Sequence, residues 1–212
     1  MNTQSSSFQV AIISGSHRPQ SESLRVSQYL AGRIDGHSDG HRSKIVDLSG
    51  NPLPLWGPEM WSDKASAYAP EWAAISATLA ACDAVIVVAP EWGGMAPAGL
   101  KNLFLMCGGQ ELAHKPGMLI GISASRGGAY PVAELRVSSY KNTRLCYIPE
   151  NILLRNVGDL LHGPLNDDSS EDERYLRTRI DYAIEVLFLY ADGLRKVRKS
   201  PIIDHKTYPF GM

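Results

Sequence analysis

The chain has 212 residues, of which 44% are hydrophobic and 20% are charged, and its formal net charge at pH 7 is −1. This composition is too apolar for a disordered chain, and the near-zero charge gives no electrostatic reason to bind nucleic acid or an anionic membrane. No apolar stretch approaches the ~20 residues that cross a bilayer, and the N-terminus lacks a signal-peptide profile, so we expect a cytoplasmic protein with no membrane partner.

Short apolar segments alternate with helix-like segments along the chain. The predicted strands are residues 10–13, 44–48, 84–89, 118–123 and 152–156. The third and fourth are apolar at successive positions, which is typical of strands covered on both faces of a parallel sheet. Apolar positions at helical spacing predict helices over residues 24–34, 72–82 and 100–107, and from about 172 to 198. A helix is also predicted over residues 130–144, where the periodicity is weak.

These elements predict an α/β fold, a doubly wound five-stranded parallel sheet with helices on both faces in three α/β/α layers. Five strands in a chain of this length favour the flavodoxin-like order 2-1-3-4-5 over the Rossmann order. We expect residues 1–7 to form a flexible tail and residues 8–212 a single domain. The last helix is apolar around much of its circumference, so it is either deeply covered within the domain or meets another subunit.

The segment that follows the first predicted strand, residues 14–23, has the composition of a phosphate-binding loop. It contains four serines and Arg18, and it leads into the N-terminus of a helix, where backbone N–H groups are unpaired. The alternative is an ordinary capped turn with Ser21 or Ser23 as the N-cap. His17 is either an additional donor or a spacer. Because no G-x-G-x-x-G or G-x-x-x-x-G-K-[ST] motif is present, the loop suits a terminal monophosphate such as that of FMN.

Two further loops with paired glycines follow the third and fourth strands. Trp92 offers an aromatic face beside Gly93 and Gly94, and these glycines allow close approach to a flat ligand. The alternative for this loop is a plain turn into a helix. Residues 123–130 again combine paired glycines with a single arginine. Because ligands bind at the carboxyl ends of strands in such sheets, three loops of this chemistry at one edge favour a ligand site there.

Three segments carry a specific resemblance. Residues 15–21 match the pattern G-S-x-R-x-x-S, and residues 90–102 resemble P-E-Y-N-G-S-x-P-x-x-L-K-N. Residues 47–48 together with 52–55 are similar to a loop that follows the second strand. On these segments the chain resembles the NAD(P)H-dependent FMN reductase family, a flavodoxin-like group that includes chromate, quinone and azo-dye reductases.

The resemblance implies an FMN-dependent NAD(P)H oxidoreductase, with FMN and NAD(P)H as cofactors, that passes electrons to a quinone, free flavin or a similar small molecule. It implies a homodimer or homotetramer. The implied phosphate ligands are Ser16, Arg18, Ser21 and Ser23. The implied lining of the flavin ring and ribityl chain is Pro90, Glu91, Trp92, Gly93 and Gly94, and Ser125, Arg126 and Gly127 would lie near the pyrimidine edge. Arg126 would face the reduced flavin, a phosphate of NADPH, or water. No catalytic side chain is expected, because the cofactor carries the chemistry.

The chain departs from the family pattern at three places. Trp92 replaces a tyrosine, Gly93 replaces an asparagine, and the acidic residue often found shortly after L-K-N is missing. The alternative function is a flavodoxin-like FMN-binding electron carrier, or a binding protein without nicotinamide activity. Electron carriers of this fold tend to be strongly acidic, which this chain is not.

The remaining candidate ligands do not indicate a metal site. His37 and His41 have the spacing of a helical metal pair, but Gly36 and Gly40 make a helix unfavourable there, so we expect a solvated loop. The three cysteines lack metal-ligand spacing, and Cys82 and Cys107 fall on apolar helix stripes, which indicates core positions.

Overall fold

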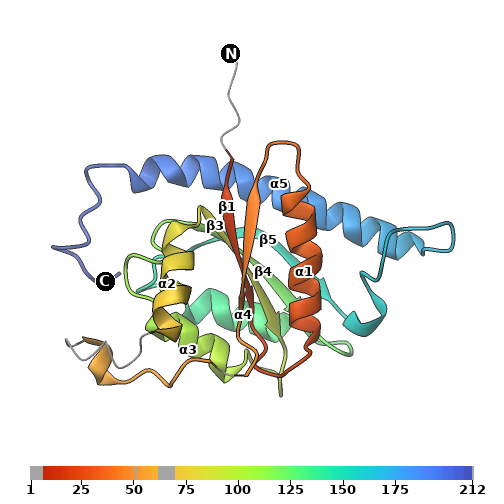
Figure 1. Cartoon of the computed structure of the whole chain (residues 1–212), viewed down its shortest axis with the longest axis horizontal. Coiled ribbons are helices and arrows are strands. Elements are labelled where there is room, and N and C mark those ends of the chain that lie inside the picture. Colours follow the sequence, from red (N-terminus) through yellow and green to blue (C-terminus); the bar gives the residue numbers. More distant parts are fainter. Residues whose placement is uncertain (1–6, 51, 62–69, 212) are drawn as a thin grey trace, which may run out of the picture.

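A computed structural model describes residues 7–50, 52–61 and 70–211 (Figure 1). Five parallel strands form one sheet in the order β2-β1-β3-β4-β5, which confirms the predicted flavodoxin-like topology. The strands are β1 (Gln9–Ser14), β2 (Arg42–Asp47), β3 (Ala84–Pro90), β4 (Pro116–Ile122) and β5 (Cys146–Leu154). The helices are α1 (Glu22–Asp35), α2 (Glu71–Ala81), α3 (Ala98–Met106), α4 (Ala129–Ser138) and α5 (Glu171–Arg198), with 3-10 turns at η1 (Pro58–Trp61) and η3 (Val157–Asp159). The predicted tail falls outside the described residues except for Ser7.

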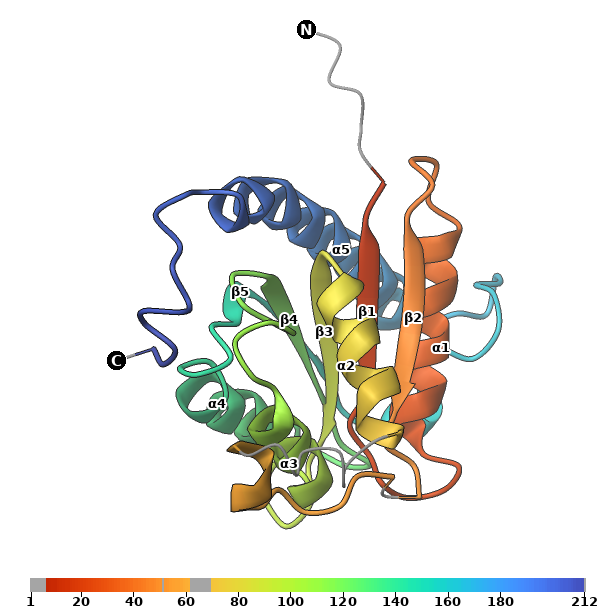
Figure 2. The same cartoon turned by 60° about the vertical axis from the view of Figure 1, so that its left-hand side comes forward.

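The sheet lies between two helical layers (Figure 2). Val10 and Ile12 of β1 pack into a core shared with α1 and α5, whereas Ala11 and Ile13 pack on the other face with α2, α3 and α4. β3 and β4 are buried at every position, as their unbroken apolar sequences predicted. The three-layer α/β/α arrangement is therefore confirmed.

Most predicted boundaries differ from the structure by a few residues at most, but those of β5 and α4 differ by more. β5 begins at Cys146, earlier than predicted. The sequence did not indicate this start, because the first half of the strand contains Pro149 and Glu150 and is not a continuous apolar segment. This edge strand also carries a register irregularity against β4, opposite Gly117 to Leu119. α4 ends at Ser138, earlier than predicted, and Arg144 has a left-handed backbone with φ 53°.

The long helix α5 is amphipathic. Its inner face buries Ile180, Ile184 and Leu187 in the same core as α1. Its outer face exposes several large apolar side chains, including Tyr175, Tyr182 and Leu189. The sequence left two alternatives for this helix, coverage within the domain or contact with another subunit. The domain covers the inner face only, and the apolar side chains of the outer face stay exposed. Within the described residues, no helix combines the length and the apolar composition that crossing a membrane requires.

The parallel register brings three connections to the same edge of the sheet. Ser14 pairs with Val88, and Pro90 pairs with Ile122, so β1, β3 and β4 end side by side. Backbone hydrogen bonds extend this alignment beyond the strands, from Gly15 N to Val88 O and from Glu91 N to Ile122 O, each 2.9 Å long. The loops that the sequence singled out therefore leave the sheet together, at its lower edge in Figure 2.

Candidate functional site

The β1–α1 loop begins with a close approach of backbone to its neighbours. A Cβ atom on Gly15 would lie 2.7 Å from Val88 O and 2.8 Å from a methyl carbon of Leu100, so only glycine fits at this position. Ser16 is buried, and its Oγ accepts a hydrogen bond from the N–H of Arg18 at 3.2 Å. Ser21 is the N-cap of α1 and accepts from Leu24 N at 3.2 Å. The loop is thus held by its own hydroxyls and ends at a helix N-terminus, while the side chain of Arg18 is exposed.

Unpaired polar atoms are concentrated around this loop. Ser14 and Ser23 are almost completely buried, and the Oγ atoms of both lack a hydrogen-bond partner among the described residues, as does the buried Nδ1 of His17. Only two other buried side-chain atoms in the described part of the chain share this property, and both lie on α5. Buried polar groups are normally paired, so this cluster indicates a place where a polar ligand completes the structure.

The β3–α3 loop contains a two-residue turn. The backbones of Trp92 and Met95 exchange two hydrogen bonds of 3.0 Å, and the residues between them, Gly93 and Gly94, have φ values of 58° and 78°. Positive φ at both central positions defines a type I′ turn, which favours Asn-Gly or Gly-Gly. Glycine at position 93 therefore preserves the backbone that asparagine would give in the family pattern.

Glu91 joins this loop to the β4–α4 loop. Its Oε2 accepts a hydrogen bond of 2.5 Å from the N–H of Gly128, the N-cap residue of α4. A Cβ atom on Gly127 would lie 2.6 Å from Glu91 Oε1, so the carboxylate packs directly on the glycine backbone. The side chain of Glu91, which the resemblance placed along a flavin ring, is thus engaged between two loops.

The β4–α4 loop is fixed mainly through its backbone. Ser125 N donates to Ser123 Oγ at 3.2 Å, and Ser125 O accepts from Asn156 N at 2.8 Å. Gly127 O accepts from Arg155 Nε at 3.3 Å. The side chain of Arg126 is exposed at this edge. The structure therefore brings residues 125–127 to the same edge as the other two loops, with Arg126 accessible to a ligand.

The L-K-N segment on α3 supports the site instead of facing it. Lys101 Nζ lies 2.9 Å from Glu134 Oε1 on α4, and Glu134 Oε2 accepts from Ala96 N at 2.7 Å. Burial favours the neutral acid, but the hydrogen bonds from Ala96 and Lys101 outweigh it and lower the pKa of Glu134. Asn102 is buried, donates to Pro54 O at 2.8 Å and accepts from Trp56 N at 2.7 Å.

Sequence reasoning missed Glu134, Asn102 and the unpaired atom of His17. The carboxylate partner of Lys101 comes from another helix, distant in sequence, and nothing in the local pattern marks it. Asn102 belongs to a recognised motif, but its role as a clamp on residues 54–56 depends on where the β2–α2 connection crosses α3.

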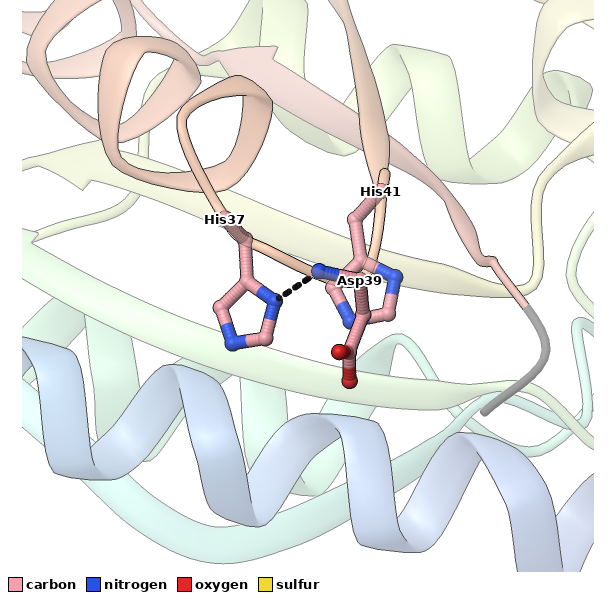
Figure 3. A group of neighbouring side chains, drawn as sticks. All are labelled: His37, Asp39 and His41. Atoms are coloured by element: carbon pink, nitrogen blue, oxygen red, sulfur yellow. Dashed lines mark hydrogen bonds between the residues drawn. The ribbon is translucent and has the colours of Figure 1, made fainter. Parts of the chain in front are cut away.

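His37, Asp39 and His41 form a cluster just before the first residue of β2, at the edge of the sheet opposite to the three loops (Figure 3). His41 is only 1% exposed, so the expectation of a solvated loop is wrong for this residue. Packing against α5 explains the burial, because the His41 ring contacts the ring of Phe188, with centroids 4.0 Å apart and the ring planes tilted by 49°. One potential ligand atom from each of the three residues lies within 4.8 Å of the other two.

The hydrogen bonds of this cluster fix the histidine tautomers. His37 Nδ1 accepts from Asp39 N, the dashed line in Figure 3, and His41 Nδ1 accepts from Phe8 N, both at 3.1 Å. A neutral imidazole that accepts at Nδ1 carries its hydrogen on Nε2, and His37 Nε2 lies 2.8 Å from Glu185 Oε1. If a metal ion were coordinated by Nε2 of either histidine, the ring hydrogen would have to be on Nδ1. Nδ1 would then be a donor that faces the backbone N–H it now accepts from. These hydrogen bonds therefore do not favour metal coordination through Nε2, and the absence of a metal site stays a prediction.

An open parallel sheet of this order, with loops at the carboxyl ends of β1, β3 and β4, defines a protein of the flavodoxin-like fold. A family model described as NADPH-dependent FMN reductase matches residues 8–158. The chain belongs to the NADPH-dependent FMN reductase family. The predicted FMN-dependent NAD(P)H oxidoreductase, with FMN and NAD(P)H as its cofactors, is thereby confirmed.

Solved structures share the fold. The flavoenzyme NAD(P)H:(acceptor) oxidoreductase FerB from Paracoccus denitrificans is 21% identical with a TM-score of 0.64, covering 88% of this chain and 98% of its own. An oxidoreductase from Corynebacterium diphtheriae is 13% identical, with a TM-score of 0.63 and coverages of 92% and 99%. An NAD(P)H:quinone oxidoreductase from Methanothermobacter marburgensis is 14% identical, with a TM-score of 0.57 and coverages of 84% and 98%. A search of curated protein sequences found no match.

Proposed function

We propose that FMN binds across the three loops at the carboxyl edge of the sheet, within one domain formed by residues 8–212. The cluster of unpaired buried atoms at Ser14, His17 and Ser23 carries this proposal, because it lies where the G-S-x-R-x-x-S pattern enters α1. The residues fit a phosphomonoester: the α1 N-terminus offers backbone N–H groups, the serines offer hydroxyls, and Arg18 offers an exposed guanidinium.

The other two loops suit the rest of the cofactor. We assign the flavin ring and ribityl chain to Pro90–Gly94, where the type I′ turn exposes two glycines beside the ring of Trp92. We assign the pyrimidine edge to Ser125–Gly127. Glu91 acts there by holding the two loops together, because its Oε2 accepts the hydrogen bond from Gly128 N.

When bound, FMN supplies hydride acceptance from the nicotinamide and delivery of electrons to a second substrate. The protein positions both molecules and tunes the ring. We propose a small-molecule acceptor of the quinone or free-flavin type, since fold relatives carry the names NAD(P)H:quinone oxidoreductase and NAD(P)H:(acceptor) oxidoreductase. We further propose a cytoplasmic homodimer or homotetramer, for which the exposed apolar side chains on α5 offer contact surface.

Cofactor analysis of the purified protein after denaturation tests the first step, and released FMN is the expected result. Anaerobic mixing of the FMN-loaded protein with NADPH tests the second, and rapid bleaching of the flavin absorbance is expected. Bound FMN without bleaching would instead favour an electron carrier. A protein that neither retains nor takes up FMN would overturn the proposal.

Arg18→Ala tests the phosphate site directly. Loss of a charge-assisted hydrogen bond is expected to weaken FMN binding by about 1.5–3 kcal/mol. Riboflavin, which lacks the phosphate, provides the matched ligand, and its affinity is expected to be unchanged by the substitution. Unchanged FMN affinity would count against the assignment of this loop.

A further inference from the structure

His17 is held in place from two sides at the centre of the candidate flavin site. Its ring lies edge-on to the ring of Trp92, with centroids 4.4 Å apart and an interplanar angle of 66°. Its backbone oxygen accepts a hydrogen bond of 3.1 Å from Gly50 N, which fixes it to the connection after β2. The residue thus links the β1–α1 loop to the β3–α3 loop, through its ring contact with Trp92, and to the connection after β2, through its backbone.

The polar chemistry of this side chain is incomplete. His17 Nδ1 is buried and has no hydrogen-bond partner within the described part of the chain. In proteins such nitrogens are almost always paired, and an imidazole nitrogen pairs with a hydroxyl in either tautomer, because a hydroxyl both donates and accepts. A ligand with hydroxyl groups therefore suits this atom better than one with acceptors alone.

The position of His17 specifies which part of a ligand it meets. In the chain it stands between Ser16 and Arg18, which we assign to the phosphate, and in space it touches Trp92, which we assign to the flavin ring. The ribityl chain of FMN, with its three secondary hydroxyls, connects these two parts. The family pattern leaves this position open, so a histidine here is a property of this chain.

We propose that His17 is a flavin-binding residue whose Nδ1 hydrogen-bonds a ribityl hydroxyl, while its ring supports Trp92. This inference rests on the proposed FMN site. It makes His17 a determinant of how strongly the protein prefers flavins with a polyol chain over the bare ring system.

Three variants separate the roles of the ring and its nitrogens. His17→Phe keeps an aromatic ring against Trp92 but removes both nitrogens. His17→Asn places an amide atom near the position of Nδ1, whereas His17→Gln places one near the position of Nε2. Far-UV circular dichroism and thermal unfolding of the full-length variants establish that each is folded.

The experiment measures dissociation constants for FMN, riboflavin and lumiflavin by quenching of flavin fluorescence. His17→Phe and His17→Gln are expected to weaken FMN and riboflavin alike by five- to tenfold, and to leave lumiflavin, which lacks the ribityl chain, within twofold of the unchanged protein. His17→Asn is expected to retain riboflavin affinity within twofold. Arg18→Ala serves as the contrasting variant, because it is expected to weaken FMN only.

Two results would overturn the inference while leaving the flavin site intact. One is FMN and riboflavin binding that His17→Phe does not weaken. The other is an equal loss for lumiflavin and riboflavin, which would show that His17 acts only through Trp92 and the ring. If the unchanged protein binds neither FMN nor riboflavin, the proposed function itself fails, and the two failures are thereby distinguished.

Discussion

The carboxylate of Glu91 caps a helix that belongs to a different strand connection. The N-cap residue of α4 is Gly128, which has no side chain to cap the helix and adopts φ 101°, and the first turn contains no acidic residue. Glu91 Oε2 accepts a hydrogen bond from Gly128 N, the backbone group that the Glu or Gln of a capping box pairs with in other helices. A negative charge at this end is favoured by the helix dipole. The two loops that we assign to the flavin ring are therefore locked to each other before any ligand arrives.

Glu91→Ala is expected to loosen this connection. The free energy of unfolding should fall by about 1 kcal/mol, the usual effect of losing one hydrogen bond. FMN affinity should fall as well, because the two loops lose their fixed separation. Glu91→Gln retains an acceptor oxygen and is the matched control, expected to recover most of both losses. Chemical denaturation and fluorescence titration measure the two effects, and equal behaviour of both variants would assign the role to charge instead of to the hydrogen bond.

The type I′ turn predicts opposite outcomes for substitutions at neighbouring positions. Gly93→Asn restores the family residue and should change stability by less than about 0.5 kcal/mol, because asparagine tolerates a left-handed backbone. Gly94→Val should cost about 1–2 kcal/mol or more, because a β-branched residue is strained at φ 78°. Thermal unfolding of the two variants tests the assignment of the turn. Similar melting temperatures for both would refute it.

Asn102 provides a prediction about the scaffold. Its amide joins α3 to the backbone of Pro54 and Trp56, and it is only 4% exposed. Asn102→Ala should lower the free energy of unfolding by about 2–3 kcal/mol, since two buried hydrogen bonds are lost together. Asn102→Asp keeps the acceptor for Trp56 N but removes the donor to Pro54 O. The decrease in unfolding free energy of this variant therefore tests the bond to Pro54 separately. Urea denaturation measures both, and a neutral Asn102→Ala variant would contradict the clamp.

His41 makes stability depend on pH in a defined direction. Burial is the main cause that lowers its pKa below the ordinary value of about 6.5, and the neighbouring His37 lowers it further, against the opposing effects of Asp39 and Glu185. The unfolded chain therefore binds a proton more readily than the folded chain, so stability decreases as the pH falls through and below 6.5. Protonation of Nδ1 would also break the hydrogen bond from Phe8 N.

The measurement for this prediction is urea denaturation between pH 5 and pH 8. His41→Asn is the matched variant, because its amide oxygen can accept from Phe8 N but does not titrate. Its unfolding free energy should vary less with pH across this interval than that of the unchanged protein. A steeper decline for the variant at low pH would exclude His41 as the source.

Strand order, helix order and the edge that carries the loops could all be predicted from the sequence. The fully buried strands β3 and β4 have unbroken apolar runs, and this pattern arises only where both faces are covered. β5 was predicted less accurately, because an edge strand mixes polar and apolar residues and its start has no apolar signal. The fourth helix ends at Ser138 and not at the predicted residue 144, because weak periodicity in this segment gives no clear signal for its end.

The candidate site, too, could be predicted only in part. Local features such as the Ser21 cap and the paired glycines follow from the order of residues, and the structure shows both. Contacts between distant segments, such as Lys101 with Glu134 and His17 with Trp92, depend on how the loops cross. No periodicity or spacing in a single sequence reports them. The burial of His41 was likewise hidden, because it is imposed by α5, which lies far along the chain.

The position of Asn102 has an evolutionary consequence. Lys101 and Asn102 are tied up with α4 and the β2–α2 connection, so selection for a stable fold alone is enough to preserve them. In the first loop, the hydroxyls of Ser16 and Ser21 accept hydrogen bonds from the loop backbone and from α1. The hydroxyls of Ser14 and Ser23 have no such partner among the described residues. In a descendant that no longer bound flavin, we therefore expect substitutions to accumulate first in the serines and arginine of the β1–α1 loop. Lys101 and Asn102 would be retained for longer, because the fold still needs them.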